Sequence, residues 1–417
     1  MRKTIFKILQ KIKKGSFFEN IDFMERNYGT FTEETQQKYF VDFLQHAINT
    51  TNYYRNYSKY KTVSECPVIT KDTIKDNYED FISNNYKKEN LIQTTTSGSY
   101  GTPFTFLFTK EKKEIQRSDI IYFSKWAYYD VGVKHGYALA KNKPMLLQIL
   151  QNQYVIIPFK ITEDWLEKEV QKLKKRKLKV LIGYPSTLGA IAKHILMKNE
   201  TYKLDGVITI SEVLTDNVRE DITKAFGVKP LSRYTTEELG VLGMECPEEQ
   251  NLHLNNVNFI IEILDKNNNR VQPGEQGEVV VTDLHSHAMP LIRYKTGDLA
   301  ILGEKTCSCG LKTPYLKKLL GRQLEVIYAP DGNKVESMTI NGRMRDIKGI
   351  RQFQFVQTGK SEYTLNIVKQ VENIDESEII NRYKVVLGQE ANILFNYVDD
   401  IPPLNSGKRP YILQKYY

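Results

Sequence analysis

One aspartate follows a glycine in the segment Arg293–Leu299, whose sequence is RYKTGDL. Gly297 lets the backbone turn tightly before Asp298, and the apolar pair Leu291 and Ile292 precedes the segment. A carboxylate held on such a turn can accept two hydrogen bonds from a ribose diol, a contact stronger than one between neutral groups. A Thr-Gly-Asp tripeptide also occurs in ordinary strand-end turns, so this interpretation needs support from other segments.

Hydroxyl and glycine residues are concentrated between positions 94 and 103, where the sequence is TTTSGSYGTP. Glycines allow backbone N–H groups to face an anion, and hydroxyls add further donors. The chain has no G-x-x-x-x-G-K-[S/T] loop, because the sequence Gly359-Lys360-Ser361 lacks the earlier glycine. The pattern predicts a phosphate-binding loop of another kind, and the alternative is a flexible surface turn. Its candidate residues are Thr96, Ser97, Gly98, Ser99, Gly101 and Thr102.

Two adjacent glutamates, Glu237 and Glu238, lie in the segment Arg233–Gly240, whose sequence is RYTTEELG. Carboxylate oxygens suit Mg²⁺, a hard cation that in proteins often bridges to substrate phosphates. The alternative is a pair of solvated glutamates at the start of a helix, where the helix dipole favours negative charge.

A Gly-Lys pair closes the segment IPPLNSGK near the C-terminus, ending at Lys408. A lysine ammonium is a compact charge on a long stem. It can stabilise negative charge that develops in a transition state. An isolated Gly-Lys pair would instead suggest a basic C-terminal tail.

Taken in order, these segments resemble the motifs of the adenylate-forming superfamily of acyl-CoA synthetases and adenylation domains. Within that superfamily the chain is most similar to the phenylacetate-CoA ligase branch and its CapK-type and coenzyme F390 synthetase-like members. The resemblance extends from the segment CPVITK, which begins at Cys66, to Arg409. The Gly321-Arg322 pair resembles the hinge motif of these enzymes.

The resemblance implies a role for each matching residue. Asp298 and Arg322 would contact the ribose, Glu238 would hold Mg²⁺, and Lys408 would reach the carboxylate and the α-phosphate from a mobile lid. The remaining nucleotide-binding residues would be the phosphate loop together with Ser211, Glu212, Tyr234, Thr235 and Thr236.

Several positions depart from the family pattern. The phosphate loop lacks a common lysine and has a large residue in place of a small hydroxyl one, and the glutamate segment has two replacements. The choice between Glu237 and Glu238 as the magnesium ligand therefore stays open. The hinge also lacks its usual aspartate. The departing residues are Tyr100, Thr102, Thr235, Glu237 and Leu324.

The resemblance implies ATP-dependent activation of a small carboxylic acid through an acyl-adenylate, followed by transfer to a thiol, with CoA as the expected acceptor. A carrier thiol or an amine is an alternative acceptor. The chain could instead be a non-catalytic nucleotide-binding scaffold of polysaccharide assembly, or a membrane-associated acyltransferase that uses a preformed donor. Aromatic candidates for the acyl pocket, which are equally typical of core residues, are Trp126, Tyr128, Tyr129 and Tyr184.

Three cysteines and one histidine form a possible zinc-binding set: Cys246, His253, Cys307 and Cys309. Three Cys and one His are a familiar tetrahedral ligand set for structural zinc, although these spacings are less common than paired C-x2-C motifs. Some relatives of the phenylacetate-CoA ligase branch resemble this pattern and carry zinc. His285 and His287 are competing ligands.

The composition is that of a soluble globular protein, with 41% hydrophobic and 26% charged residues among 417. The formal net charge of +9 suits an anionic substrate, but it also fits a lysine-rich composition. No basic run with interleaved aromatics predicts nucleic-acid binding. Neither a signal peptide nor a membrane span is predicted, so we expect a cytoplasmic protein, with weak peripheral membrane contact through residues 1–14 as an alternative.

Alternating helical and strand-like patterns predict an α/β fold. We expect a large N-terminal region, residues 1–321, with mainly parallel sheets and a β subdomain, and a small α+β lid domain, residues 322–417. Predicted helices cover residues 110–129, 164–175, 186–198, 216–226 and 376–386. Predicted strands cover residues 145–150, 180–183, 206–210, 228–231, 259–264, 278–284, 353–356 and 363–368.

Overall fold

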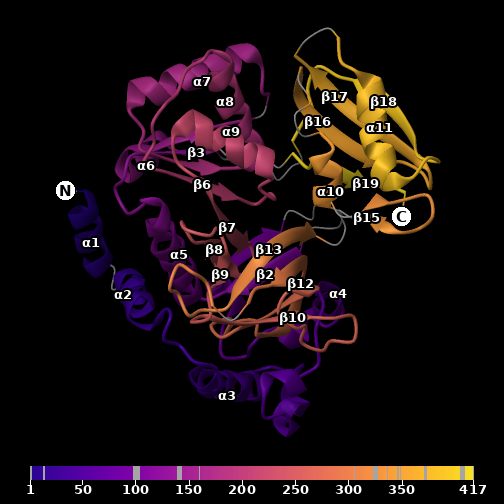
Figure 1. Cartoon of the computed structure of the whole chain (residues 1–417). Coiled ribbons are helices and arrows are strands. Elements are labelled where there is room, and N and C mark those ends of the chain that lie inside the picture. The colour runs from indigo at the N-terminus through magenta and orange to yellow at the C-terminus, as the bar shows by residue number, and fades with distance from the viewer. Residues whose placement is uncertain are drawn as a thin grey trace. The chain divides into compact units, whose positions relative to one another are not determined.

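The structure is a computed structural model that describes residues 2–12, 15–96, 104–138, 143–158, 160–304, 306–322, 327–335, 337–344, 347, 349–370, 373–403 and 409–416. Its contacts divide the chain into two compact units. The first unit comprises residues 1–132 and 231–319, and the second comprises residues 133–230 and 320–417. The division interrupts the chain order, and Figure 1 shows the elements of each unit.

Helices form the N-terminal part of the first unit. Thr32 and Thr70 cap two of them by accepting hydrogen bonds from the backbone N–H three residues on. The apolar face of α3 buries Phe40, Phe43 and Leu44 in the same core as the strands of this unit. The helices are α1 (Arg2–Ile12), α2 (Phe17–Asn27), α3 (Glu33–Thr50), α4 (Lys71–Asp76) and α5 (Lys110–Ser124), with 3₁₀ helices at Arg55–Lys59, Val63–Glu65, Tyr78–Phe81, Lys88–Asn90 and Lys125–Ala127.

The strands of the first unit are largely antiparallel. Their order is β10-β11-β12-β13-β9-β8-β7, and a separate hairpin pairs β1 with β2. The alternating residues of β10 and β11 fold as predicted, with Val279 and Val281 buried. The strands are β1 (Ile92–Thr96), β2 (Phe104–Phe108), β7 (Leu231–Thr236), β8 (Gly240–Glu245), β9 (Leu252–Leu254), β10 (Phe259–Leu264), β11 (Gln276–Asp283), β12 (Leu291–Leu302) and β13 (Tyr315–Arg322).

The second unit contains parallel strands in the order β6-β5-β3-β4, as the βαβ pattern predicts. β5 and β6 are buried along their whole length, which is typical of strands covered on both faces. The elements are β3 (His135–Ala138), α6 (Met145–Gln151), β4 (Gln153–Ile156), α7 (Glu163–Arg176), β5 (Val180–Gly183), α8 (Pro185–Met197), β6 (Gly206–Ile210) and α9 (Asp216–Phe226).

The C-terminal part of the second unit is a small α+β assembly. A four-stranded sheet in the order β18-β17-β16-β19 packs on α11 through Phe355, Tyr363 and Tyr383. Its elements are β14 (Ile327–Tyr328), β15 (Lys334–Val335), α10 (Ser337–Gly342), β16 (Ile350–Gln357), β17 (Glu362–Lys369), α11 (Glu376–Leu387), β18 (Asn392–Tyr397) and β19 (Ile412–Gln414). The predicted domain boundary after Gly321 stays a prediction.

Two predicted strands are wrong. Residues 145–150 form helix α6, because a short apolar run has no periodicity that separates a strand from a helix. Residues 228–230 precede β7, which begins only at Leu231 and continues through the segment predicted to bind a nucleotide. The five predicted helices and the other predicted strands form within a few residues of the expected bounds.

Arg293 fixes the course of the chain toward Asp298. It is buried in an irregular part of β12, with φ at +53°, which is unusual for a residue other than glycine. Its Nε and Nη2 donate to the two carboxylate oxygens of Glu262 at 3.0 and 3.2 Å, and its Nη1 donates to the backbone oxygen of Cys66 at 2.8 Å. Two backbone hydrogen bonds, each 2.9 Å long, hold the segment further: Ile69 N donates to Arg293 O, and Lys295 N donates to Ile69 O.

We expect Arg293→Ala to lower the free energy of unfolding of the first unit by about 3–5 kcal/mol, because it leaves the buried Glu262 carboxylate without its partner. Arg270→Ala is the matched control: Arg270 Nε lies 3.6 Å from the same carboxylate, but its side chain is 56% exposed, so the loss should stay below about 1 kcal/mol. Urea unfolding followed by tryptophan fluorescence in a Trp165→Phe background, which leaves Trp126 of the first unit as the single tryptophan, measures both. Equal losses in the two variants would contradict this role.

Candidate functional site

Asp298 and Tyr234 face each other in the first unit. β12 carries Asp298, and β7 carries Tyr234, whose Oη donates a hydrogen bond of 2.5 Å to Asp298 Oδ2. Gly297 has φ at +80° and lies where the β11–β12 register shifts, so the predicted turn is instead an irregularity inside the continuous strand β12. Thr296 Oγ1 accepts from Asp298 N at 3.1 Å and donates to Val279 O. The aspartate is therefore held in a fixed position and is 8% exposed.

Glu238 lies close to this pair, whereas Glu237 is exposed. Tyr294 Oη donates to Glu238 Oε1 at 3.3 Å, and Thr236 Oγ1 accepts from Leu239 N, which closes the turn between β7 and β8. Burial raises the pKa of Tyr234 well above its usual value, and the charges of Asp298 and Glu238 raise it further. Each of the two buried carboxylates thus accepts a hydrogen bond from a tyrosine, Asp298 from Tyr234 and Glu238 from Tyr294, and acidic groups are concentrated at this site. We call Tyr234, Glu238, Tyr294, Thr296 and Asp298 the Asp298 cluster.

A half-buried lysine near the glutamate segment was not predicted from the sequence. Lys113 on α5 donates to Gln116 Oε1 at 3.0 Å and lies 4.2 Å from the centroid of the Phe108 ring. Burial lowers the pKa of Lys113 to about 8, and the charge of Glu237 opposes that shift. The only signal in the sequence was a cation soon after the strand that follows the predicted phosphate loop.

Two buried polar atoms in the same region have no hydrogen-bond partner among the described residues: Gln116 Nε2 and Thr235 Oγ1. Gln116 packs against Gly240 at the start of β8, where an added Cβ would approach its side chain to 2.8 Å. Buried polar groups usually have a partner, so a polar ligand in this region is a reasonable explanation.

Ser211 and Glu212, two other predicted nucleotide-binding residues, lie in the second unit. Ser211 has φ at +67° directly after β6. Glu212 accepts from Ser186 N at 3.0 Å, from Ser186 Oγ at 3.1 Å and from Arg409 N at 3.0 Å. Ser186 is in the first turn of α8, where the helix dipole favours a carboxylate. Glu212 therefore fastens the residue after Lys408 to the start of α8.

Several predicted site residues lie outside the described residues: Ser97, Gly98, Ser99, Gly101, Thr102 and Lys408. Only the backbone of Thr96 and Arg322 is described, at the ends of β1 and β13. Thr96 pairs with Phe104 across the β1–β2 hairpin, so the two ends of the predicted phosphate loop meet. The loop and the lysine stay predictions.

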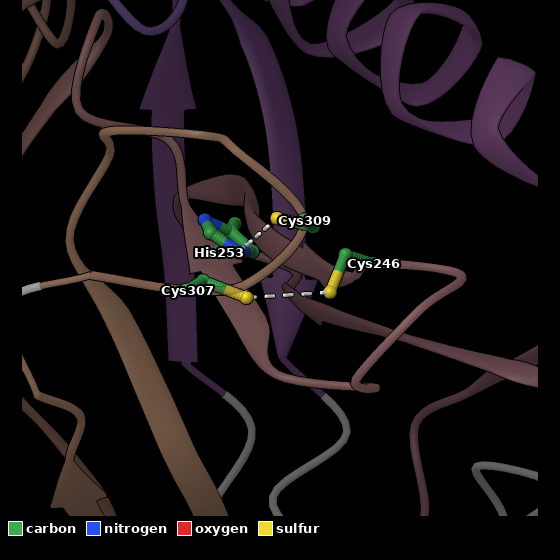
Figure 2. A group of neighbouring side chains, drawn as sticks. All are labelled: Cys246, His253, Cys307 and Cys309. Carbon is green, nitrogen blue, oxygen red and sulfur yellow. Dashed lines mark hydrogen bonds between the residues drawn. The ribbon is translucent and has the colours of Figure 1, made fainter.

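The four residues of the possible zinc set come together in the first unit. Their ligand atoms, from Cys246, His253, Cys307 and Cys309, all lie within 4.8 Å of one another. Figure 2 shows the side chains pointing toward one another, with Cys246 Sγ 3.9 Å from Cys307 Sγ and Cys309 Sγ 3.2 Å from His253 Nε2. The sulfurs are free thiols rather than a disulfide. We call these residues the Cys/His cluster.

Neighbouring side chains orient this cluster. His253 Nδ1 is 2.7 Å from Thr313 Oγ1, and Asn251 Nδ2 donates to Cys307 Sγ at 3.3 Å. The competing histidines are not part of it. His285 Nε2 lies 3.0 Å from Asn258 Oδ1, and the His287 ring packs on the rings of Phe43 and His46.

The aromatic candidates for an acyl pocket belong to both units. Trp126 packs on Tyr28 and Phe123, beside the His253 ring, and so supports the Cys/His cluster. Tyr128 is 74% exposed. Tyr184 is buried in the second unit at the start of α8.

Comparison with known proteins agrees with the resemblance seen in the motifs. Residues 327–415 match the CapK C-terminal domain. Protein CapK of Staphylococcus aureus is 24% identical over 413 residues, covering 91% of this chain and 88% of its own. Phenylacetate-coenzyme A ligase of Thermus thermophilus is 30% identical over 163 residues, covering 37% of each chain. This chain is a homologue of CapK and of the phenylacetate-CoA ligases.

The fold is that of the adenylate-forming CoA ligases. A crystal structure of 2-hydroxyisobutyryl-CoA ligase in the postadenylation state, in complex with an acyl-AMP, superposes with a TM-score of 0.72 at 16% identity, covering 94% of this chain and 92% of that one. The predicted α/β fold class with a small C-terminal α+β domain is confirmed. Among the residues that the structure describes, no helix is both long and apolar enough to cross a bilayer.

We expect Glu212→Ala to speed hydrogen exchange at the Arg409 amide by about tenfold or more, because a bond to a charged acceptor contributes about 1.5–3 kcal/mol. Glu212→Gln keeps an acceptor oxygen and should show a smaller increase. Glu220→Ala, on an exposed part of α9, is the control. Mass-spectrometric exchange on peptides that begin several residues before Arg409 and extend through it provides the measurement, and unchanged protection in Glu212→Ala would show that Glu212 does not hold this segment.

Proposed function

We propose that the protein is an AMP-forming acid–thiol ligase with two half-reactions. In the first, an oxygen of a substrate carboxylate attacks the α-phosphorus of ATP, and pyrophosphate leaves with the electrons of the α,β-bridging bond to give acyl-AMP. In the second, a thiol attacks the acyl carbon, AMP leaves, and the thiol proton passes to solvent. The observation that carries the proposal is the Tyr234–Asp298 pair beside Glu238 in a chain with this ligase fold.

The Asp298 cluster would bind the nucleoside. Asp298 is an acceptor fixed in strand β12 beside a register shift, and Tyr234 orients it by donating to Oδ2, so a ribose diol would bind the carboxylate in one geometry. The Lys113 ammonium and the Thr235 hydroxyl, which has no partner among the described residues, would form hydrogen bonds to polar groups of the nucleotide. Lys408 would offset the charge that develops at the α-phosphate, as the motif resemblance implies.

Glu238 fits Mg²⁺ better than Glu237 does. It is buried beside Asp298, whereas Glu237 is exposed near Lys113. An oxygen donor in an acidic site is the environment that a hard divalent cation requires. When bound with ATP, Mg²⁺ would offset the negative charge of the phosphates.

CoA is the acceptor that we propose, because phenylacetate-CoA ligases are among the homologues. A carrier thiol or an amine is the alternative. The acid is an aryl or small acyl acid, and the similarity to CapK suggests a role in capsular or exopolysaccharide biosynthesis. The absence of the common loop lysine, replaced by Thr102, favours one other function, a nucleotide-binding scaffold without catalysis.

We also propose that the Cys/His cluster holds a structural Zn²⁺. Tetrahedral zinc with Zn–S near 2.3 Å and Zn–N of about 2.0–2.1 Å requires ligand atoms roughly 3.5–3.8 Å apart. The S···S separation of 3.9 Å and the S···N separation of 3.2 Å are close to this. Thr313, bonded to His253 Nδ1, would fix the ring so that Nε2 is the ligand atom. With four protein ligands, the metal would have no open position for catalysis.

ATP–pyrophosphate exchange with Mg²⁺ tests the ligase proposal against a panel of aryl, short-chain and amino acids. We expect exchange with at least one acid, and a loss of about a hundredfold or more in Lys408→Ala, because one group that stabilises transition-state charge contributes on this scale. Lys415→Ala, an exposed lysine near the same end of the chain, should retain exchange. ATP binding without exchange for any acid would support the scaffold instead.

Metal analysis by inductively coupled plasma mass spectrometry tests the zinc proposal. We expect about one zinc per chain, lost in Cys309→Ser together with a lower unfolding temperature, because binding free energy of a structural zinc contributes to folding. Cys66→Ser is the control, since Cys66 is buried in the core away from the cluster. A zinc content that is unchanged in Cys309→Ser, or near zero in the wild type purified without chelators, would overturn the assignment.

A further inference from the structure

Helix α6 of the second unit exposes an unusual amount of apolar surface. Five of its seven residues are large aliphatic side chains, and none of the seven is buried. Their exposed fractions are 76% for Met145, 68% for Leu146, 43% for Leu147, 57% for Ile149 and 57% for Leu150. Single exposed apolar residues are ordinary, but a contiguous patch normally marks an interaction site.

The apolar side of α6 faces outward and its polar side faces the protein, the reverse of an ordinary surface helix. At about 100° per residue, the five aliphatic side chains fall within an arc of about 200°, and Gln148 and Gln151 occupy the rest. The glutamines face the protein: Gln148 Nε2 donates to Lys143 O at 2.7 Å, Gln148 Oε1 accepts from Val155 N at 3.4 Å, and Gln151 Oε1 accepts from Lys143 Nζ. The polar face is therefore satisfied by the protein's own chain, and the apolar face is directed outward.

The sequence around α6 is basic. Between Asp130 and Glu163 it contains no aspartate or glutamate, and its four lysines are Lys134, Lys141, Lys143 and Lys160. An apolar helix face with lysines nearby can bind a surface that has an apolar interior and negatively charged groups above it. An anionic lipid bilayer has both properties.

A second copy of the chain fits this patch less well. A stable protein–protein interface buries about 800 Å² on each partner, which a single two-turn helix cannot supply. The neighbouring β4 is an edge strand, and such strands can pair with another chain. Here the Val155 N–H of β4 already donates to Gln148 on α6, which obstructs pairing at that point.

Helix α1 lies in the region that the sequence suggested for membrane contact, and it packs on its own unit through Phe6 and Lys3. The Phe6 ring packs on Phe17 and Phe18 of α2, and Lys3 pairs with Asp130. Ile12 is exposed, but it is a single residue at the helix end.

We propose that α6 is a membrane-surface helix whose apolar face enters the headgroup region of an anionic bilayer. The exposed lysines of this stretch, Lys134 and Lys160, would contact lipid phosphates, whereas Lys143 is bonded to Gln151 and Gln153. This inference does not depend on the ligase proposal, since it concerns where the protein binds and not what it catalyses.

Vesicle co-sedimentation of the full-length protein tests the proposal. We expect binding to vesicles of equimolar phosphatidylcholine and phosphatidylglycerol, weaker binding to pure phosphatidylcholine, and weaker binding at high salt because the electrostatic part is screened. The triple variant Leu146→Gln, Leu147→Gln and Leu150→Gln should bind at least about tenfold more weakly. The matched control, Val385→Gln with Leu394→Gln, changes side chains that are 76% and 56% exposed on the C-terminal part, and should bind like the wild type.

The outcomes separate a bilayer from a second copy as the occupant of the patch. All these side chains are exposed, so the variants should unfold at the wild-type temperature, and a thermal scan checks that they are folded. Absence of vesicle binding by the wild type, or equal binding by the triple variant, would overturn the proposal. So would a dimer, seen by light scattering, that requires the α6 side chains when vesicles are not bound, because the occupant would then be a second copy.

Discussion

The buried ion pair between Arg293 and Glu262 is the constraint on which the proposed nucleotide site depends. Arg293 takes a left-handed conformation inside a strand, and its guanidinium ties β10 to the segment that ends at Cys66. Such a conformation persists only where the surroundings fix it. Five residues later the same strand presents Asp298, so the ion pair determines where that carboxylate lies. Removing one member of a buried pair leaves the other charge uncompensated, so this geometry depends on both residues.

The site that results is a concentration of negative charge with polar groups around it. Asp298 and Glu238 are both buried and accept hydrogen bonds from Tyr234 and Tyr294. Lys113 on α5, whose pKa burial lowers, lies near Glu237. On the proposed function, a ribose and a metal–phosphate group would compensate these charges. The Cys/His cluster joins β8, β9 and the loop before β13 in the same unit, so a bound zinc would stiffen strands that neighbour β7 and β12 in the sheet order.

Short motifs with fixed chemistry could be predicted from the sequence. Asp298 lies near Tyr234 and Glu238, and the four members of the Cys/His cluster lie together, while the roles of these residues stay predictions. Long-range packing could not be predicted. Lys113 is significant only because α5 packs near the glutamate segment. The apolar run of α6 reads as a strand in the sequence because the hydrogen bonds that its glutamines form with Lys143 and Val155 leave no pattern there. Tertiary structure decides which residues a helix or strand contacts, and local propensity does not encode those contacts.

Calorimetric titration of MgATP into the wild type, Asp298→Asn and Tyr234→Phe tests the central claim, that the Asp298 cluster is the nucleotide site. The account predicts an affinity about tenfold or more lower for Asp298→Asn, since a hydrogen bond to a charged group contributes about 1.5–3 kcal/mol. It predicts a smaller loss for Tyr234→Phe, which keeps the carboxylate and removes only its orienting phenol. Equal affinities in all three proteins, each shown to be folded by its unfolding temperature, would contradict the account.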